Sequence, residues 1–91
     1  MKPKKKTKYY EWQQKALQGG VCSTCNRRFD VLTVDHIIPQ SIVQVIDPEA
    51  VYEDEENFML VCAACNRFKA GRIDIKNPKT KELLIKYANK I

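Results

Sequence analysis

The sequence has a single histidine, no apolar run as long as a membrane helix, and no apolar segment behind its basic start. Because a membrane helix needs about 20 consecutive apolar residues, no membrane span is expected. A secretory signal peptide requires an apolar core after its positive residues, so we expect none and expect a cytoplasmic location. There is also no internal repeat. The 91 residues therefore predict one small domain.

Charge is distributed unevenly along the chain. Segment 47–56 has six acidic residues and no basic one, whereas the remainder has all 16 lysines and arginines but only five of the 11 acids. Such a basic surface favours a polyanionic partner, most simply nucleic acid, although a soluble protein with solvated lysines has the same composition. Residues 1–8, with five lysines, are expected to be a flexible basic arm, and residues 9–91 the single domain.

The four cysteines form two CxxC pairs, Cys22 with Cys25 and Cys62 with Cys65. In a chain without signs of secretion the thiols are expected to be reduced. Two such pairs are typical of a tetrahedral zinc site, and a domain of this size often needs such a staple. A redox-active pair and buried free thiols are the alternatives, but redox chemistry needs only one pair. We expect structural Zn²⁺ bound by all four cysteines.

Helical periodicity marks both ends of the chain. Residues 9–17 place Tyr9, Trp12 and Ala16 on one face of a helix. This aromatic stripe is interpreted as packing, with a base-stacking surface as the alternative. Asn77-Pro78 is a typical helix start, with the asparagine as N-cap and the proline in the first turn.

The middle of the chain favours strands. Residues 31–38 are rich in β-branched side chains and residues 57–61 are apolar, so both are predicted to be strands. Residues 40–46 are ambiguous between strand and short helix. The acidic segment 47–56 is interpreted as a surface excursion that can include a helical turn. A short helix is expected after Cys65. The predicted architecture is therefore α+β: a β-hairpin and a helix, tied by zinc and flanked by N- and C-terminal helices.

Three motifs lie in order along this architecture: VDHIIP at 34–39, EN at 56–57 and CAACNRFKAG at 62–71. In this order they resemble the HNH endonuclease family, and the similarity spans 22–71. The resemblance implies a small zinc-stabilised ββα-metal domain, similar to a treble clef. One residue departs from the family's namesake pattern, since the third histidine is Asn66 here, as in the HNN members. An asparagine carbonyl oxygen can still ligate a hard cation.

The resemblance implies divalent-metal-dependent cleavage of DNA. His36 is the expected general base, because an imidazole with a pKa of about 6.5 is largely neutral near pH 7. Asp35 and Asn66 are expected to ligate Mg²⁺ or Mn²⁺ at the scissile phosphate, and Asn57 to hold the loop between the strands and so orient His36. Alternation along a strand sends Asp35 and His36 to opposite faces. A shared site therefore requires the strand to end or twist there, which Pro39 permits.

Contacts with the DNA backbone are expected from basic residues on or after the helix that carries Asn66, and more weakly from the first cysteine pair. The candidates are Arg67, Lys69, Arg72, Arg27 and Arg28. Without a base-reading pattern, we expect recognition of shape and phosphate with low sequence specificity. One site cuts one strand, so a monomer would nick DNA, whereas a double-strand break requires a homodimer or two events. The resemblance implies 5′-phosphate and 3′-hydroxyl products.

A non-catalytic zinc-knuckle module that binds nucleic acid is the alternative function. It explains the cysteine pairs and the basic charge, but it does not explain Asp35 and His36 in combination with Asn57 and Asn66. A thiol redox protein is a weaker alternative. His36 itself could also be a structural histidine or a zinc ligand, although four cysteines already complete a tetrahedron.

Overall fold

The structure, a computed structural model, describes residues 6–91. The helices are α1 (Lys8–Leu17), α2 (Gln40–Ile46), α3 (Ala50–Glu53), α4 (Ala63–Lys69) and α5 (Pro78–Ala88), with a 3-10 turn, η1, at Glu55–Asn57. The strands are β1 (Gly20–Val21), β2 (Arg28–Phe29), β3 (Thr33–His36) and β4 (Phe58–Val61). Of the predicted basic arm, residues 1–5 lie outside the described residues, and Lys8 already belongs to α1.

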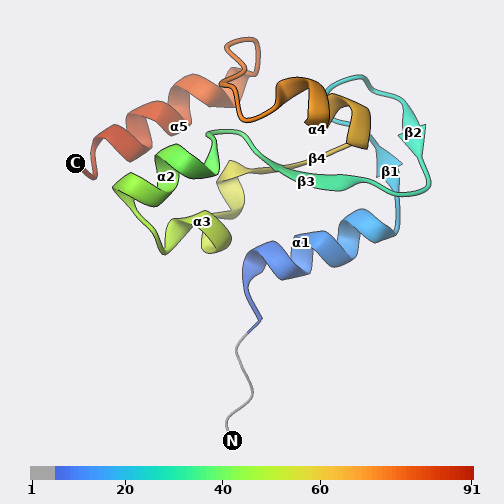
Figure 1. Cartoon of the computed structure of the whole chain (residues 1–91), viewed down its shortest axis with the longest axis horizontal. Helices are drawn as coiled ribbons and strands as arrows, with labels where there is room; N and C mark the ends of the chain where they lie inside the picture. The colour runs from blue at the N-terminus through green and yellow to red at the C-terminus, as the bar shows by residue number, and fades with distance from the viewer. Residues whose placement is uncertain (1–5) are drawn as a thin grey trace, which may run out of the picture.

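Strands β3 and β4 pair antiparallel at the centre of the molecule, with Thr33 opposite Val61 and His36 opposite Phe58. In the view of Figure 1, α1 lies on one side of this pair and α4 on the other, and both pack against β3. The chain passes from β4 directly into α4, so the predicted order of hairpin and helix is confirmed. A second two-stranded sheet, β1 with β2, was not predicted, because strands of two residues have no detectable periodicity.

Helix α1 packs through the face that the sequence predicts. Ala16 is buried, and Tyr9 and Trp12 pack against the core. The helix is followed by Gly19, whose backbone has a positive φ of 76°. A Cβ at this position would overlap the carbonyl oxygen of Asp30, so the close return of the chain requires glycine. The contacts of Tyr9 and Trp12 with the core confirm the interpretation of the aromatic stripe as packing.

The interpretation of the acidic segment as a surface excursion with a helical turn is right about the turn, which is α3, but wrong in placing the whole segment outside the core. Ala50 and Val51 in α3 are buried, and α3 packs against both α1 and α2. From the same segment, the Asp54 carboxylate accepts hydrogen bonds from Lys86 Nζ at 2.8 Å and from Tyr87 Oη at 2.7 Å. The charges of the segment thus bind α5, while its few apolar residues reach the core.

Strand β3 is shorter than the predicted 31–38, and the ambiguous 40–46 is the helix α2. The last backbone bond of the pairing runs from the N–H of Ile37 to the carbonyl of Asn57, at 2.8 Å. The sheet ends after it because Pro39 has no N–H and directly precedes α2. His36 is therefore the last residue of β3, and the strand ends where a shared site for Asp35 and His36 requires it to end.

Helix α5 begins at the predicted residue. Asn77 Oδ1 accepts a hydrogen bond from the backbone N–H of Lys79 at 2.9 Å, and Pro78 occupies the first turn. Leu83 and Tyr87 are buried, and α5 packs against α2. Within residues 6–91, none of the helices has the length and apolar character that crossing a membrane requires.

Candidate active site and metal centre

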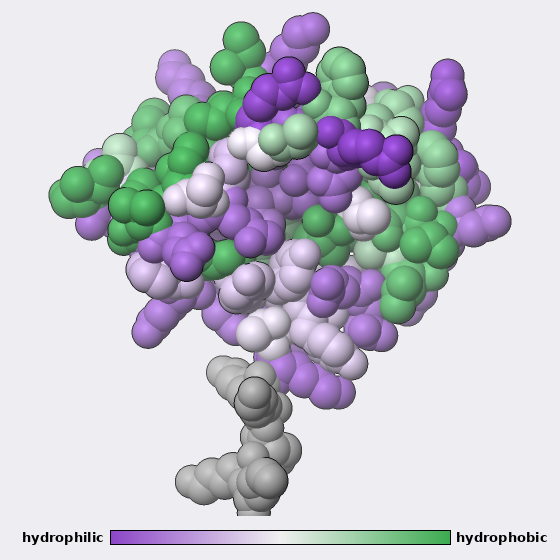
Figure 2. All heavy atoms as spheres, in the orientation of Figure 1, coloured by the Kyte–Doolittle hydropathy of each residue, from purple (hydrophilic) through white to green (hydrophobic). Residues whose placement is uncertain are grey.

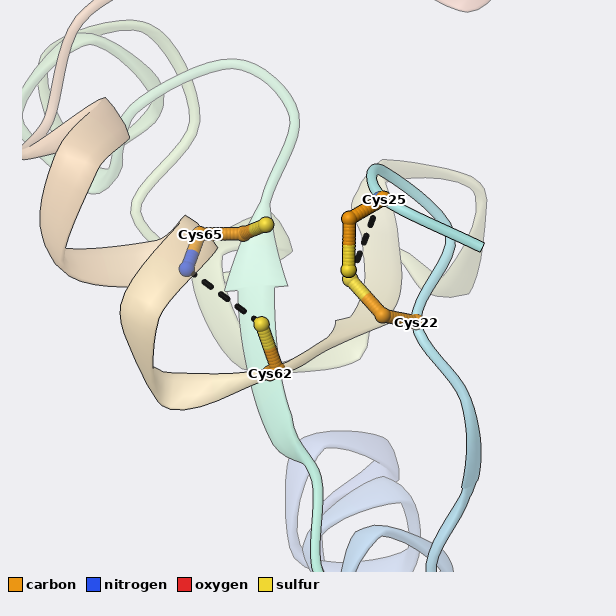
Figure 3. Close-up of side chains that lie close together, drawn as sticks. All are labelled: Cys22, Cys25, Cys62 and Cys65. Atoms are coloured by element: carbon orange, nitrogen blue, oxygen red, sulfur yellow. Dashed lines mark hydrogen bonds between the residues drawn. The ribbon is translucent and has the colours of Figure 1, made fainter. Parts of the chain in front are cut away.

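The sulfur atoms of the four cysteines converge on one point (Figure 3). Cys22 and Cys25 lie in the turn between β1 and β2, Cys62 follows β4, and Cys65 lies in α4. The four sulfur atoms are all within 4.8 Å of one another. A tetrahedral zinc ion with bonds of about 2.3 Å to sulfur needs sulfur atoms roughly 3.8 Å apart. The cluster therefore has the donor set and nearly the spacing to hold such an ion.

Each cysteine pair forms a tight turn that directs backbone N–H groups at sulfur. The N–H of Cys25 donates to Cys22 Sγ at 3.5 Å, and that of Cys65 donates to Cys62 Sγ at 3.4 Å (Figure 3). Burial opposes ionisation of Cys22, but the N–H donors of Cys25, Cys62 and Thr24 outweigh it and lower the pKa of the thiol to about 6. The pKa of Cys65 shifts the other way, to about 12, chiefly because of its hydrogen bond with the Cys62 side chain. The first thiolate of the cluster therefore forms at Cys22, and the thiolate is the form that ligates metal.

A second group of polar side chains meets in a cavity of about 380 Å³ at the end of β3, here called the His36 cavity. Asp35 and His36 both line it, although they are neighbours on the strand. Asn66 and Lys69 reach it from α4. The fold thus brings together at one cavity the three side chains to which the sequence assigns base and metal-ligand roles, with Lys69 as a fourth.

The geometry around His36 determines which ring nitrogen carries the proton. His36 is only 4% exposed, and its Nε2 lies 2.6 Å from the carbonyl oxygen of Val51. A carbonyl can only accept, so Nε2 is the protonated nitrogen and Nδ1 carries the lone pair, which faces the amide of Gln40 at 3.3 Å. Burial lowers the pKa of His36, although the Val51 bond and the Asp35 charge oppose this. The imidazole is therefore neutral near pH 7, with Nδ1 available as a base.

Asp35 presents a buried carboxylate oxygen without a hydrogen bond. Among the described residues, Oδ2 of Asp35 has no hydrogen-bond partner. The Lys69 ammonium forms an ion pair with this oxygen at 3.3 Å and also donates a hydrogen bond to the His36 carbonyl at 2.7 Å. The ion pair compensates the charge of the carboxylate, but a buried oxygen that accepts no hydrogen bond still has lone pairs for a further ligand. Carboxylate oxygens are ligands that Mg²⁺ and Mn²⁺ prefer, so Asp35 fits a hard cation.

Asn66 is held at the wall of the same cavity by a hydrogen bond of its side chain. Its Nδ2 donates to Thr33 Oγ1 at 2.9 Å, and that hydroxyl donates to the Val61 carbonyl at 3.0 Å. The bond uses the donor end of the Asn66 amide. Its carbonyl end is a hard oxygen ligand of the same class as the Asp35 carboxylate.

Asn57 does not line the His36 cavity and contacts the backbone behind it. Its side chain is fully buried. Its Oδ1 accepts from the Ile38 N–H at 2.7 Å, and its Nδ2 donates to the Ile38 carbonyl at 3.0 Å. The asparagine therefore fixes both polar groups of a residue that is two positions after His36.

The predicted DNA-contacting residues occupy different places. Hydrophilic and hydrophobic side chains are mixed over the face drawn in Figure 2. Arg67 is exposed on α4. Lys69 instead points into the His36 cavity, and the Arg72 guanidinium donates to carbonyls of the last turn of α4. Arg27 and Arg28 lie near the cysteine cluster and do not line the His36 cavity.

Sequence reasoning missed several contributors to this site. The ring of Tyr9 lies 5.4 Å from the His36 ring, and that of Phe58 lies 5.1 Å from it, measured between centroids. The aromatic stripe of α1 was visible in the sequence, but only the fold shows that it reaches the histidine. The role of the Val51 carbonyl could not be predicted, because every residue has a backbone carbonyl and the sequence does not show which one contacts His36. Gln40 was passed over as part of an ambiguous segment.

A protein-family model described as HNH endonuclease matches residues 22–72, which is more than half of the 91-residue chain. The matched span begins at the first cysteine of the cluster and ends just after α4, so α1 and α5 lie outside it. It contains all four cysteines and Asp35, His36, Asn57 and Asn66. No curated protein sequence and no solved structure gives a significant match.

Proposed function

The chain belongs to the HNH endonuclease family, and we propose on that premise that it is a divalent-metal-dependent endonuclease that hydrolyses phosphodiester bonds of DNA with low sequence specificity. One observation carries the proposal. The His36 cavity joins a neutral buried imidazole, the Asp35 carboxylate, whose Oδ2 accepts no hydrogen bond, and the amide of Asn66. Phosphodiester hydrolysis needs an activated water, stabilisation of phosphoryl charge and help for the leaving oxygen, and these groups can supply all three.

His36 is the proposed general base. Because Nε2–H is committed to the Val51 carbonyl, Nδ1 accepts the proton of a water molecule that displaces the Gln40 amide. The water oxygen bonds to phosphorus, the bond between phosphorus and the 3′ oxygen breaks, and the 3′ oxygen takes a proton from solvent. The products have 5′-phosphate and 3′-hydroxyl ends. The Val51 carbonyl also stabilises the imidazolium that forms.

Asp35 and Asn66 are the proposed ligands of Mg²⁺ or Mn²⁺. When bound, such an ion would neutralise charge on the scissile phosphate and on the leaving oxygen. Lys69 has a positioning role, because its ammonium holds the His36 carbonyl and lies beside Asp35. Asn57 fixes the Ile38 backbone, so it holds the turn that follows the base in place.

The four cysteines are the proposed ligands of structural Zn²⁺. None of them lines the His36 cavity, so the zinc has no place in the reaction. It would instead join the turn between β1 and β2 to the start of α4. Asn66 directly follows Cys65, so the same metal that contributes folding energy also fixes the position of a catalytic-metal ligand.

DNA is the proposed partner, and its phosphates are the proposed contacts. The surface candidates are Arg67 and Arg72 on or after α4, with Arg27 and Arg28 at the first cysteine pair. Lys69 lines the His36 cavity and would contact only a phosphate that enters it. Binding through phosphates releases counterions, so affinity should fall steeply as salt rises. One cavity of this kind cuts one strand, so a single chain is expected to nick.

A plasmid-nicking assay separates this proposal from a zinc-knuckle module that only binds nucleic acid. Zinc-loaded protein is incubated with supercoiled plasmid without added metal, with Mg²⁺ and with Mn²⁺, and DNA affinity is measured in parallel. The nuclease converts supercoiled plasmid to open circles when either metal is added. If neither metal supports conversion while DNA binding persists, the binding module is the better description.

A further inference from the structure

A second cavity, here called the α1 cavity, adjoins the His36 cavity. Its volume is about 450 Å³, which lies within the roughly 300–1,000 Å³ range of small-ligand pockets. It shares Tyr9, Val34 and Asn66 with the His36 cavity, so the two cavities meet at these residues. One wall is α1, which runs alongside β3 in Figure 1. This helix lies outside the span that the family model matches.

The lining of the α1 cavity has no charged side chain. Its polar groups are the amides of Gln13, Gln14 and Asn66 and the hydroxyls of Thr33 and Tyr9. Its apolar groups are Ala16, Leu17, Leu32 and Val34. A phosphate would require cationic partners, which this lining lacks. Side-chain amides can instead form paired hydrogen bonds with the edge of a base, and apolar side chains can contact a sugar or a base face. The chemistry therefore matches an uncharged nucleoside.

The α1 cavity is accessible to a strand that passes over the surface. Gln13 and Gln14 are exposed, and Leu17 at the rim is 61% exposed. At the border between the two cavities the Tyr9 ring packs against two other rings, that of Tyr52 at 5.3 Å and that of His36 at 5.4 Å between centroids. A strand can thus reach both cavities without displacing the core.

We propose that the α1 cavity is a subsite for the nucleoside of the nucleotide next to the scissile phosphate. The inference rests on the proposed nuclease function, because that function places the phosphate at His36 and Asn66. Asn66 lines both cavities, so a strand with its phosphate in the first presents a neighbouring nucleoside to the second. Gln13 and Gln14 then add contacts to one side of the cleaved bond, beyond recognition of shape and phosphate.

The test uses a double variant, Gln13→Ala with Gln14→Ala, and the control Gln44→Ala. Gln44 is exposed on α2 and lines neither cavity. Alanine is the best helix former, so α1 should persist in the double variant. The substrate is an end-labelled duplex with or without a single abasic residue, and cleavage at each bond is quantified. The bonds remote from the abasic residue serve as an internal control.

For the wild type, cleavage at the bond on one side of the abasic residue should fall by roughly 10-fold relative to remote bonds, as expected for the loss of one or two hydrogen bonds. The double variant should lose a similar factor in kcat/KM on intact DNA and should respond little to the abasic residue. The subsite is refuted if the wild type cleaves but ignores the abasic residue, or if the double variant matches Gln44→Ala. If the wild type cleaves nothing, the proposed function fails and the subsite fails with it.

Discussion

Replacing Asn57 with alanine tests how the turn after His36 is held. Asn57 is fully buried and makes two hydrogen bonds, of 2.7 and 3.0 Å, with the backbone of Ile38, which is also 0% exposed. Alanine removes both and leaves the N–H and the carbonyl of Ile38 without partners. An unsatisfied buried polar group costs about 1–3 kcal/mol, so the expected loss in the free energy of unfolding is about 2–6 kcal/mol. That is a large share of the roughly 5–15 kcal/mol typical of a domain.

The assay is urea unfolding at a fixed zinc concentration, followed by the fluorescence of Trp12, the only tryptophan. The matched control is Asn89→Ala, because Asn89 is exposed just after α5. It should change the free energy of unfolding by less than about 0.5 kcal/mol. Cleavage by the folded fraction of Asn57→Ala should also fall, since the Ile38 backbone no longer fixes the turn after His36. A loss of stability as small as that of the control would refute the reasoning.

Two further predictions concern the elements around the site. Cys62→Ser should lose zinc and unfold, whereas the control Ser23→Ala should retain both zinc and fold. Circular dichroism measures the fold, and metal analysis measures the zinc content. A Cys62→Ser protein that stays folded and zinc-loaded would contradict the four-cysteine site. Burial and the hydrogen bond to Asp54 raise the pKa of Tyr87 above 10.0, so the stability it contributes is present below that pH and lost as pH rises. Tyr87→Phe should therefore be less stable by about 0.5–1.5 kcal/mol at neutral pH, and the difference should shrink above about pH 10. A difference that stays constant from about pH 8 to about pH 11 would oppose this.

The sequence was sufficient to predict the residues whose side chains define the site. Asp35, His36 and Asn66 have side chains of the types that the proposed chemistry requires, and their order along one strand and the helix that follows the hairpin predicts that they meet. The His36 cavity brings them together. Asn57 could be assigned to the loop between the strands, and its bonds to Ile38 are of the kind that this role requires. The role itself stays a prediction.

Other features depend on tertiary packing that residue type does not reveal. The acidic segment was misread because its charges dominate its composition, while the two apolar residues that enter the core, Ala50 and Val51, are few. The Val51 carbonyl fixes the tautomer of His36, yet any residue type could provide that carbonyl. The α1 cavity escapes sequence reasoning because Gln13 and Gln14 resemble the solvent-facing residues of any helix.

The most direct test of the proposed function is the single-turnover rate of plasmid nicking by His36→Ala in Mg²⁺ and in Mn²⁺, with DNA affinity and zinc content measured on the same preparation. If His36 activates the water, the variant should retain zinc and DNA affinity but lose roughly 10²–10⁴-fold in rate, as expected when a general base is removed. Cleavage by His36→Ala at the wild-type rate would contradict the proposal that His36 is the base.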